Sequence, residues 1–340
     1  MQIFQSEMEK HQIKWRKNNI ENQEWGVYDI EDGKIYEHVL PEEIWEEGLF
    51  RPLRKNGKIP LNSYLVDNCI VNHPGVHNLK SSWANCANLF FPFRDKPELL
   101  KKFVEKKLKV SIKKINQLEL EFAEEKPFDP HTLLGEPIGK RGQGQTSPDV
   151  GIVFEIEDGR KGLLLIENKL VEKSFYNCSG TKDNNGDTHP EKCRGFERIY
   201  KDLSNSCFLF NWQYDKRKYW DYMLPKKESL KKMKYCPAAY GGYQLFRQQA
   251  LAEALLKTGK YSAVFSGVAY DKRNVKLIKC LSRAGIYDFT KGWGNIFHLN
   301  TGFFTFTHQE WVSFVKDNDR DGEWKEWHTY IIERYGYEAF

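Results

Sequence analysis

The chain lacks any long apolar segment. Its strongest continuous apolar run covers only residues 163–166, far short of the ~18 residues that a membrane-spanning helix requires. The first ten residues mix glutamate with lysine and contain no apolar stretch of the kind found in a secretory signal peptide. We therefore expect no membrane partner and a cytoplasmic location.

A disulfide framework is also missing. Seven cysteines are spaced irregularly along 340 residues, whereas small secreted domains carry dense cysteines that pair with one another. No two cysteines have the CxxC spacing that is typical of zinc sites. The pattern predicts free thiols and a reducing compartment.

One polar stretch nevertheless leaves a structural metal site open as an alternative. Cys178, His189, Cys193 and Cys207 could bind zinc, and Cys236 could replace the histidine in a thiolate site for zinc or an iron–sulfur cluster. Ordinary scattered cysteines are the simpler interpretation.

Charge is nearly balanced in total but unevenly distributed. Lys and Arg number 52 and Asp and Glu 47, for a net charge of +5. Residues 215–234 contain eight basic residues against three acids, and residues 96–114 contain eight lysines against two glutamates. The first block also contains Tyr219, Trp220 and Tyr222. Basic residues suit binding to a phosphate backbone, and aromatic side chains beside them are available for stacking. Solvated helix faces are the alternative for both blocks.

The order of expected elements indicates a mixed α/β core, and 40% hydrophobic residues suffice to bury one. Apolar spacing identifies helices and strands. The expected elements are a helix at residues 81–91, a strand at 117–123, a hairpin of 150–156 with 162–170, a helix at 243–257, a strand at 263–268, and two helices after residue 303, the first opened by the capping box Thr307 and Glu310.

Three parts of the chain are expected. Residues 1–80 form an N-terminal appendage in which no chemistry stands out. Residues 81–270 form the core, interrupted by a polar insertion at about 173–240. Residues 271–340 form an aromatic-rich helical extension. The fold class is therefore α/β, with helical additions at both ends.

The hairpin in the core can be given a register. Residues 157–159 fit a three-residue loop, a type I turn closed by a glycine in the left-handed region. This loop pairs the strands so that Asp149 lies opposite Glu167. Lys169 follows two residues later and therefore shares the same side of the sheet. Two carboxylates and an ammonium are expected at one end of the hairpin.

Such a trio suits metal chemistry. Neighbouring carboxylates repel each other unless they share a proton or a cation. Mg²⁺ takes one or two carboxylates and completes its shell with water and substrate phosphate. Lys169 could orient or deprotonate a water molecule, or neutralise charge on the phosphate. A surface salt-bridge cluster is the alternative.

These residues resemble a known signature. Ser147-Pro148-Asp149, followed after a hydrophobic strand by Glu167-Asn168-Lys169, resembles the PD-(D/E)XK nuclease motif. Within that superfamily the chain resembles the bacterial restriction-endonuclease-like proteins labelled PGN_0703-like, over roughly residues 80–270. The further matching segments are residues 84–90, 134–136, 141–146, 165–175 and 243–252.

The resemblance implies a restriction-endonuclease-like fold, a mixed central sheet flanked by helices. It also implies Mg²⁺-dependent phosphodiester cleavage, in which Mn²⁺ can substitute. By position, Asp149 and Glu167 would be metal ligands and Lys169 the catalytic lysine. Glu172 matches a glutamate commonly found just after the lysine, and Gln244 starts the helix that follows the catalytic sheet.

Two features depart from the family pattern. Asn168 occupies a middle position that is usually apolar or aromatic, and the insertion at 173–240 is longer than a minimal nuclease needs. Glu136 matches a glutamate ahead of the aspartate and has no role that the sequence assigns. Neither departure removes a catalytic group.

Weaker signals lie near these positions. One-turn spacing places Arg247 and Gln248 beside Gln244, where Arg247 could hold a phosphate. The alternative is the polar first turn of a core helix. His308 and His328 lie among aromatic residues and are expected to pack rather than to catalyse.

The expected function is a divalent-metal-dependent endonuclease acting on double-stranded DNA, of the restriction or defence type. A catalytically inactive nucleic-acid-binding module on the same fold and an RNA-directed nuclease are the alternatives. A homodimer would follow if one site per chain cuts both DNA strands.

Overall fold

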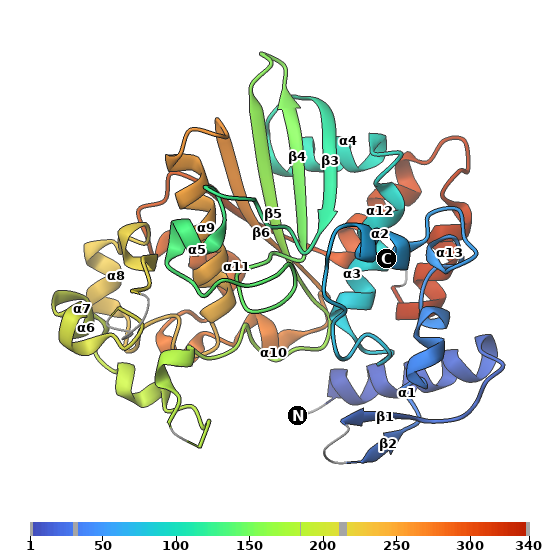
Figure 1. Ribbon diagram of the computed structural model, residues 1–340, viewed down its shortest axis with the longest axis horizontal. Helices are drawn as coiled ribbons and strands as arrows, with labels where there is room; N and C mark the ends of the chain where they lie inside the picture. The colour runs from blue at the N-terminus through green and yellow to red at the C-terminus, as the bar shows by residue number, and fades with distance from the viewer. Residues whose placement is uncertain (1–2, 30–32, 184, 211–215, 338–340) are drawn as a thin grey trace.

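A five-stranded sheet lies at the centre of the chain. The computed structural model describes residues 3–29, 33–183, 185–210 and 216–337, and Figure 1 shows the sheet between two groups of helices. In spatial order, the strands are β3 (Ile112–Leu120), β4 (Val150–Ile156), β5 (Lys161–Lys169), β6 (Ala263–Tyr270) and β7 (Gly302–Thr307).

The sheet is mixed. β3, β4 and β5 pair antiparallel, whereas β6 runs parallel to β5 and β7 runs parallel to β6. The parallel connection from β5 to β6 contains the long insertion and helix α9 (Tyr243–Lys257). The predicted α/β class with a restriction-endonuclease-like core is confirmed.

The β4–β5 hairpin has the register that the sequence predicts. Val150 pairs with Ile166, and Phe154 pairs with Gly162. Gly159 closes the loop at φ +86° and donates its N–H to the carbonyl of Ile156, 2.9 Å away. The left-handed conformation favours glycine at this position because glycine has no Cβ.

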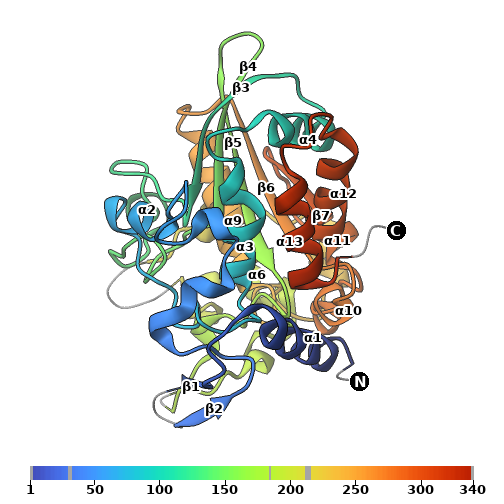
Figure 2. The same cartoon turned by 90° about the vertical axis from the view of Figure 1, so that its right-hand side faces the viewer.

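Helices cover both faces of the sheet (Figures 1 and 2). Ser81 caps the first of them, because its hydroxyl accepts the N–H of Ala84. One face of the sheet is covered by α3 (Ser82–Phe90), α4 (Glu98–Leu108), α12 (His308–Asn318) and α13 (Lys325–Tyr335). The opposite face carries α9, α10 (Val275–Ile278) and α11 (Phe289–Gly292).

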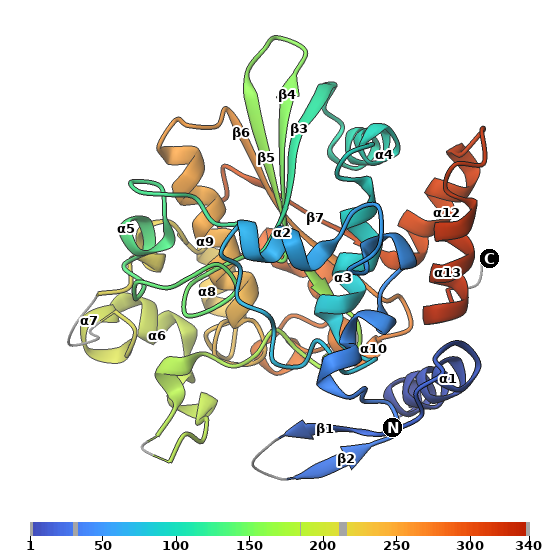
Figure 3. The same ribbon diagram turned by 45° about the vertical axis from the view of Figure 1, so that its right-hand side comes forward.

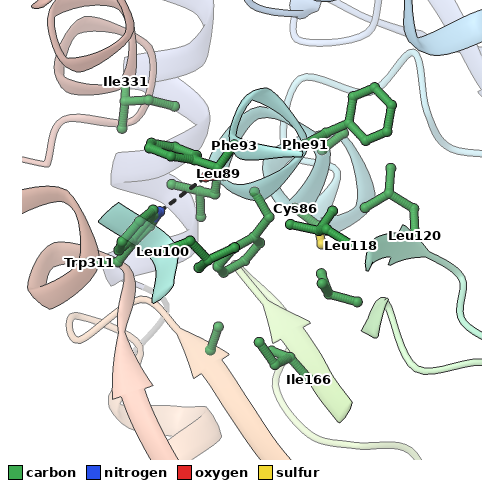
Figure 4. Packing of buried hydrophobic residues seen from close by; sticks show 14 of the residues in the cluster. Cys86, Leu89, Phe91, Phe93, Leu100, Leu118, Leu120, Ile166, Trp311 and Ile331 are labelled. Carbon is green, nitrogen blue, oxygen red and sulfur yellow. Dashed lines mark hydrogen bonds between the residues drawn. The ribbon is translucent and has the colours of Figure 1, made fainter. Parts of the chain in front are cut away.

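Aromatic side chains fill the core under α3 and α12. Phe93 stacks on Trp324 and meets Trp327 edge-on. The indole N–H of Trp311 donates to the carbonyl of Leu89 at 3.0 Å, as Figure 4 shows. Residues 81–93 are thereby held against the C-terminal helices by packing and by hydrogen bonds.

Both ends of the chain join this core. Met8 and Leu49 share one hydrophobic cluster with the sheet and with Trp311, and the Gln12 side chain donates to the carbonyl of Arg334 at 2.9 Å. The division of the chain at residues 80 and 270 stays a prediction.

The C-terminal part contains a strand that was not expected. The two expected helices are present as α12 and α13, and the capping box of Thr307 and Glu310 is confirmed. Residues 302–307, however, form β7 at the edge of the sheet. The alternation of Phe304 and Phe306 with their neighbours is a strand pattern, but it is short. The helix capping box begins directly after it and drew the assignment toward a helix.

Short elements make up the remaining segments. In the first eighty residues they are α1 (Ile3–Asn19), β1 (Gly26–Asp29), β2 (Lys34–Tyr36), η1 (Glu42–Gly48), η2 (Arg51–Leu53) and α2 (Leu61–Asp67). In the insertion they are η4 (Ser179–Thr181), η5 (Pro190–Cys193), α6 (Phe196–Lys201), α7 (Leu203–Ser206), η6 (Tyr219–Asp221) and α8 (Lys227–Lys232). The others are η3 (Phe91–Phe93), α5 (Pro130–Leu134), η7 (Ser282–Ala284) and η8 (Trp293–Asn295).

The structure also bears on the expected environment of the protein. Within the described ranges, every helix is too short or too polar to cross a lipid bilayer. None of the seven cysteines is paired in a disulfide.

Replacing Trp327 by alanine should strongly destabilise the fold. The side chain is 1% exposed and its indole N–H donates to the carbonyl of Asn88 at 2.8 Å. Loss of a buried tryptophan costs about 3–5 kcal/mol of unfolding free energy, which urea unfolding would measure. Trp25→Ala is the control, because Trp25 is 50% exposed. Equal losses in the two variants would contradict the packing described here.

Candidate active site

Three carboxylates meet at the ends of three neighbouring strands. Glu121 follows β3, Asp149 precedes β4, and Glu167 lies in β5. The N–H of Glu121 donates to the carbonyl of Asp149 at 3.0 Å, and the N–H of Asn168 donates to the Asp149 carboxylate at 2.6 Å. The strand pairing therefore brings Asp149 and Glu167 together, as the predicted register requires.

Lys169 lies on the same side of β5 as Glu167. Its Nζ is 2.7 Å from Glu167 Oε1, and the two side chains are only 5% and 7% exposed. The ammonium also lies 6.0 Å from the centre of the Tyr176 ring. This pair is buried, so the alternative of a solvated surface salt bridge does not apply to it.

Asn168 points to the opposite side, into the core. It is fully buried, and its amide donates to the carbonyl of Ser82 and to Asn85 Oδ1. Its side-chain oxygen lies 2.8 Å from His308 Nε2, while the other ring nitrogen of His308 lies 2.7 Å from the Tyr337 hydroxyl. A polar residue is suited to this position because it completes a buried hydrogen-bond network. His308 packs in the core, as expected, and burial lowers its pKa to about 4.

Glu121 is a fourth ionisable group of the site, which the sequence analysis missed. Its φ is +48°, a strained conformation for a residue with a Cβ, and such strain clusters at functional sites. Trp83 hydrogen-bonds to its carboxylate. Burial and the neighbouring Glu167 raise the pKa of Glu121 to about 8. No residue type signals this strain in the sequence, where Glu121 lies within the strand expected at residues 117–123.

The electrostatics of the cluster are those of crowded carboxylates around one ammonium. Burial, then Glu167 and Glu121, raise the pKa of Asp149 well above its usual value, against the pull of Lys169. Burial alone would lower the pKa of Lys169, but Glu167, Glu172 and Asp149 outweigh it and raise that pKa. The lysine is thus an ammonium at neutral pH. Because the carboxyl groups outnumber this one ammonium, binding of a further cation would reduce their repulsion.

A single cavity of about 600 Å³ borders this cluster. It is open to solvent, and residues from the first turns of α3 and α9 contribute to its wall. All five site residues predicted from the sequence, and Glu121, lie on its wall: Glu121, Asp149, Glu167, Lys169, Glu172 and Gln244.

Gln244 and Glu172 are fixed by backbone contacts. The N–H of Gln244 donates to the carbonyl of Phe175 at 2.9 Å, which sets the start of α9. The Glu172 carboxylate accepts the N–H of Leu170 at 2.9 Å. Gln244 Oε1 is buried and has no hydrogen-bond partner among the residues that the structure describes. An unpaired buried acceptor is costly, so this oxygen is available to a ligand in the cavity.

The first eighty residues form part of the cavity wall, which the sequence analysis did not anticipate. Tyr28 and Tyr36 from the β1–β2 hairpin, together with His38, His73 and Lys80, line it. Figure 3 shows this hairpin beside α1, below the central sheet. The appendage was read as lacking chemistry because none of its residues forms a recognisable local motif.

Other candidates lie outside the cavity wall. Glu136 is buried and accepts hydrogen bonds from Thr146 and, at 2.8 Å, from the hydroxyl of Tyr219. Arg247 Nη2 lies 3.3 Å from the same carboxylate. Burial would raise the pKa of Glu136, but Arg247 and these hydrogen bonds lower it. Arg247 is therefore engaged by Glu136, and its suggested phosphate contact is not supported.

Gln248 and the two basic blocks also lie away from the site. The Gln248 amide donates to Ser266 Oγ and to the carbonyl of Gly267, both at 3.0 Å. It is a core residue, which agrees with the structural alternative. Neither residues 96–114 nor the described part of 215–234 contributes to the cavity wall.

Comparison with known families identifies the chain. The family described as Restriction Endonuclease associating with ARP matches residues 4–336. The chain belongs to this family. No curated protein and no solved structure matches the chain.

Membership in this restriction-endonuclease family supports a nuclease of that type, and thus a hydrolase. The match also covers residues 4–80 and 271–336, for which the sequence resemblance offered no counterpart. These terminal segments are therefore part of what the family shares, which agrees with their contacts in the core and at the cavity.

The cavity residues of this restriction-endonuclease family member fit a hard divalent cation. In the described part of the chain, no group of three or more His, Cys, Asp or Glu side chains is placed as a ready set of metal ligands. Mg²⁺ does not require such a set, because one or two carboxylates suffice when water and phosphate complete its shell. Asp149, Glu167 and the unpaired Gln244 oxygen are donors of the kind that Mg²⁺ prefers.

Replacing Glu121 by glutamine should flatten the pH dependence of stability. The folded state raises the pKa of this carboxyl from 4.5 to about 8, so it binds the proton more tightly than the unfolded chain does. The free energy of unfolding therefore falls as pH rises between about 4.5 and 8. Removing this carboxyl should reduce the slope by up to about 1.4 kcal/mol per pH unit. Asp149 contributes in the same direction, so part of the slope should remain.

Urea unfolding between pH 5 and 9 in a metal-free buffer would measure this slope. Glu125→Gln is the matched control, since Glu125 is exposed nearby and should leave the slope unchanged. A Glu121→Gln slope equal to that of the wild-type protein would show that Glu121 ionises normally.

Proposed function

We propose that the chain is a divalent-metal-dependent endonuclease with a PD-(D/E)XK site that hydrolyses phosphodiester bonds of double-stranded DNA, in restriction or another form of defence. One observation carries the proposal. Asp149, Glu167 and Lys169 face one open cavity, with Lys169 Nζ 2.7 Å from Glu167, in a chain of a restriction-endonuclease family.

The proposed metal ligands are Asp149 and Glu167, with Glu121 beside them. When bound, Mg²⁺ supplies positive charge that stabilises developing charge on phosphate oxygens and favours ionisation of water. Glu121 then balances this charge from the neighbouring strand end. The proposal fits the excess of acidic over basic groups on the cavity wall, which would otherwise repel an anionic substrate.

Lys169 has the central proposed role among the protein's own groups. Its ammonium donates a hydrogen bond to a non-bridging phosphate oxygen and stabilises the negative charge that grows there. Glu167 and Glu172 hold it in the charged form and in position. Because β5 carries both Glu167 and Lys169, a rigid strand fixes the distance between them.

Gln244 and the rim of the cavity would position the substrate and water. The free Gln244 oxygen can accept a hydrogen bond from the attacking water, which orients the water toward phosphorus. The N-terminal ends of α3 and α9 border the cavity, and helix N-termini favour phosphate. Tyr28 and Tyr36 offer aromatic faces at the rim, on which bases can stack.

The assembly is a further part of the proposal. The family description names an association with ARP, so a partner of that type is proposed for this chain. A homodimer would allow single-site chains to cut both DNA strands. A cytoplasmic location stays a prediction.

Replacing Lys169 by methionine should abolish DNA cleavage. Methionine keeps much of the side-chain length and removes the charge, so we expect a loss of at least about 100-fold in Mg²⁺-dependent plasmid cutting. Lys173→Met is the matched control, because Lys173 is exposed four residues further on and should cut normally. Undiminished cutting by Lys169→Met would rule out the mechanism.

Two parallel assays decide between the competing functions. Cleavage of RNA but not of DNA would favour the RNA-directed nuclease. Salt-dependent DNA binding without cleavage under any divalent ion would favour the inactive binding module.

Replacing Asp149 by alanine should weaken metal binding. Loss of a group that only supports a metal ligand lowers metal affinity ~10–100-fold. Removal of Asp149, a proposed direct ligand, should lower the affinity at least as much. Calorimetry with Mg²⁺ and with Mn²⁺ would measure it. Asp158→Ala is the control, since Asp158 lies exposed in the loop of the same hairpin. Unchanged affinity in Asp149→Ala would remove Asp149 from the metal site.

A further inference from the structure

Four of the seven cysteines gather in the insertion, far from one another in sequence. Cys178, Cys193, Cys207 and Cys236 all line one small cavity of about 70 Å³. Cys178 and Cys236 are buried, and the other two are half-buried. The remaining three cysteines lie elsewhere in the fold. Scattered cysteines have no reason to converge in this way, so the alternative of ordinary thiols is no longer the simpler one.

Backbone pairing fixes two of the four directly opposite each other. The N–H of Cys236 donates to the carbonyl of Cys193 at 3.1 Å, and Arg194 pairs antiparallel with Tyr235. Residues opposed in this way have Cβ atoms ~5 Å apart. Cys193 and Cys236 can therefore bind the same group.

Short helical turns bring the other two cysteines to the same place. Cys178 directly precedes η4, which packs against η5, the turn that ends at Cys193. Cys207 directly follows α7. The Cys236 thiol lies within electrostatic range of the other three thiols. Four separate segments thus bring one cysteine each to the wall of the same cavity.

The surroundings of the sulfur atoms suit a thiolate-bound cofactor. The indole N–H of Trp220 donates to Cys207 Sγ at 3.4 Å, and hydrogen bonds to sulfur tune such cofactors. Ile199, Leu209 and Phe246 contribute apolar surface to the same cavity.

His189 does not belong to this group. Its Nε2 lies 2.8 Å from Asp183 and its Nδ1 lies 3.2 Å from Glu191, and it is absent from the wall of this cavity. The mixed cysteine–histidine zinc site considered from the sequence is therefore not supported, and Cys236 takes the fourth place.

The placement of the four cysteines around one cavity suits a cluster better than a single ion. A zinc ion draws four sulfur atoms to ~2.3 Å from one centre. Throughout the described ranges, no three His, Cys, Asp or Glu side chains are placed to hold one metal ion. In a [4Fe–4S] cluster each cysteine thiolate binds a different iron atom, so the four sulfur atoms need not meet at one centre.

We propose that Cys178, Cys193, Cys207 and Cys236 bind a [4Fe–4S] cluster. Four cysteine thiolates are the usual ligands of such a cluster, and the thiol protons leave to solvent as the iron binds. The site is separate from the carboxylate cavity and does not depend on the proposed nuclease function.

The cluster would have a structural role. Trp220 packs on Phe246 of α9, with ring centroids 4.8 Å apart, and the adjacent Tyr219 bonds to Glu136, which holds Arg247 of the same helix. The cluster would thereby brace the insertion against the helix that starts at Gln244.

Chemical analysis of the anaerobically purified full-length protein tests the proposal. We expect about four iron and four sulfide ions per chain, with a broad visible absorption that bleaches on reduction. Cys193→Ser and Cys236→Ser should each lose most of the iron and the absorption. Cys69→Ser and Cys280→Ser are the matched controls and should retain both, since neither residue lines the cavity.

The wild-type analysis is decisive even if a cysteine variant fails to fold. Stoichiometric zinc without sulfide, or about two iron and two sulfide ions per chain, would overturn the assignment. So would protein that takes up neither iron nor sulfide after anaerobic reconstitution, or full iron retention in Cys193→Ser and Cys236→Ser.

Discussion

The pairing of β4 with β5 is the constraint on which the rest of the site depends. It sets Asp149 beside Glu167 and allows the N–H of Asn168 to bond the Asp149 carboxylate. Because successive residues of a strand face opposite sides, a slip of one residue would exchange Asn168 with Glu167 and Lys169. The charges would then enter the aromatic core under α3, where no cation or solvent could compensate them, and Asn168 would leave its hydrogen-bond partners.

The same pairing explains why the fold tolerates so much buried charge. Three carboxylates on adjacent strand ends repel one another, as the raised pKa values of Glu121 and Asp149 express. One ammonium offsets only part of that repulsion. Such a cluster lowers stability unless protons or a cation join it. Its position at an open cavity, rather than in the closed core, lets both arrive from solvent. The arrangement therefore suits binding better than it suits stability.

The sequence could predict what local patterns determine, and little beyond them. The three-residue loop ending at Gly159 was sufficient for the hairpin register, and the periodicity of residues 243–257 gave helix α9 with its bounds. The sequence predicts a strand at residues 117–123, and a regular strand would place Leu118, Leu120 and Phe122 on one face of the sheet. Phe122 instead packs in the other core cluster, over Gly151. The left-handed turn at Glu121 reverses the alternation, and no residue type signals it.

Tertiary contacts account for what remained hidden. The β1–β2 hairpin, the edge strand β7 and the convergence of four cysteines all arise from packing between segments far apart in sequence. The appendage and the C-terminal extension appeared separable because each lacks a motif, yet α1 packs on α13 and both share the core of the sheet. The cavity wall joins Tyr28 of the N-terminal hairpin to Lys169 of the central sheet, so the site is built from more than the expected core. The family match likewise extends beyond that core, from residue 4 to residue 336.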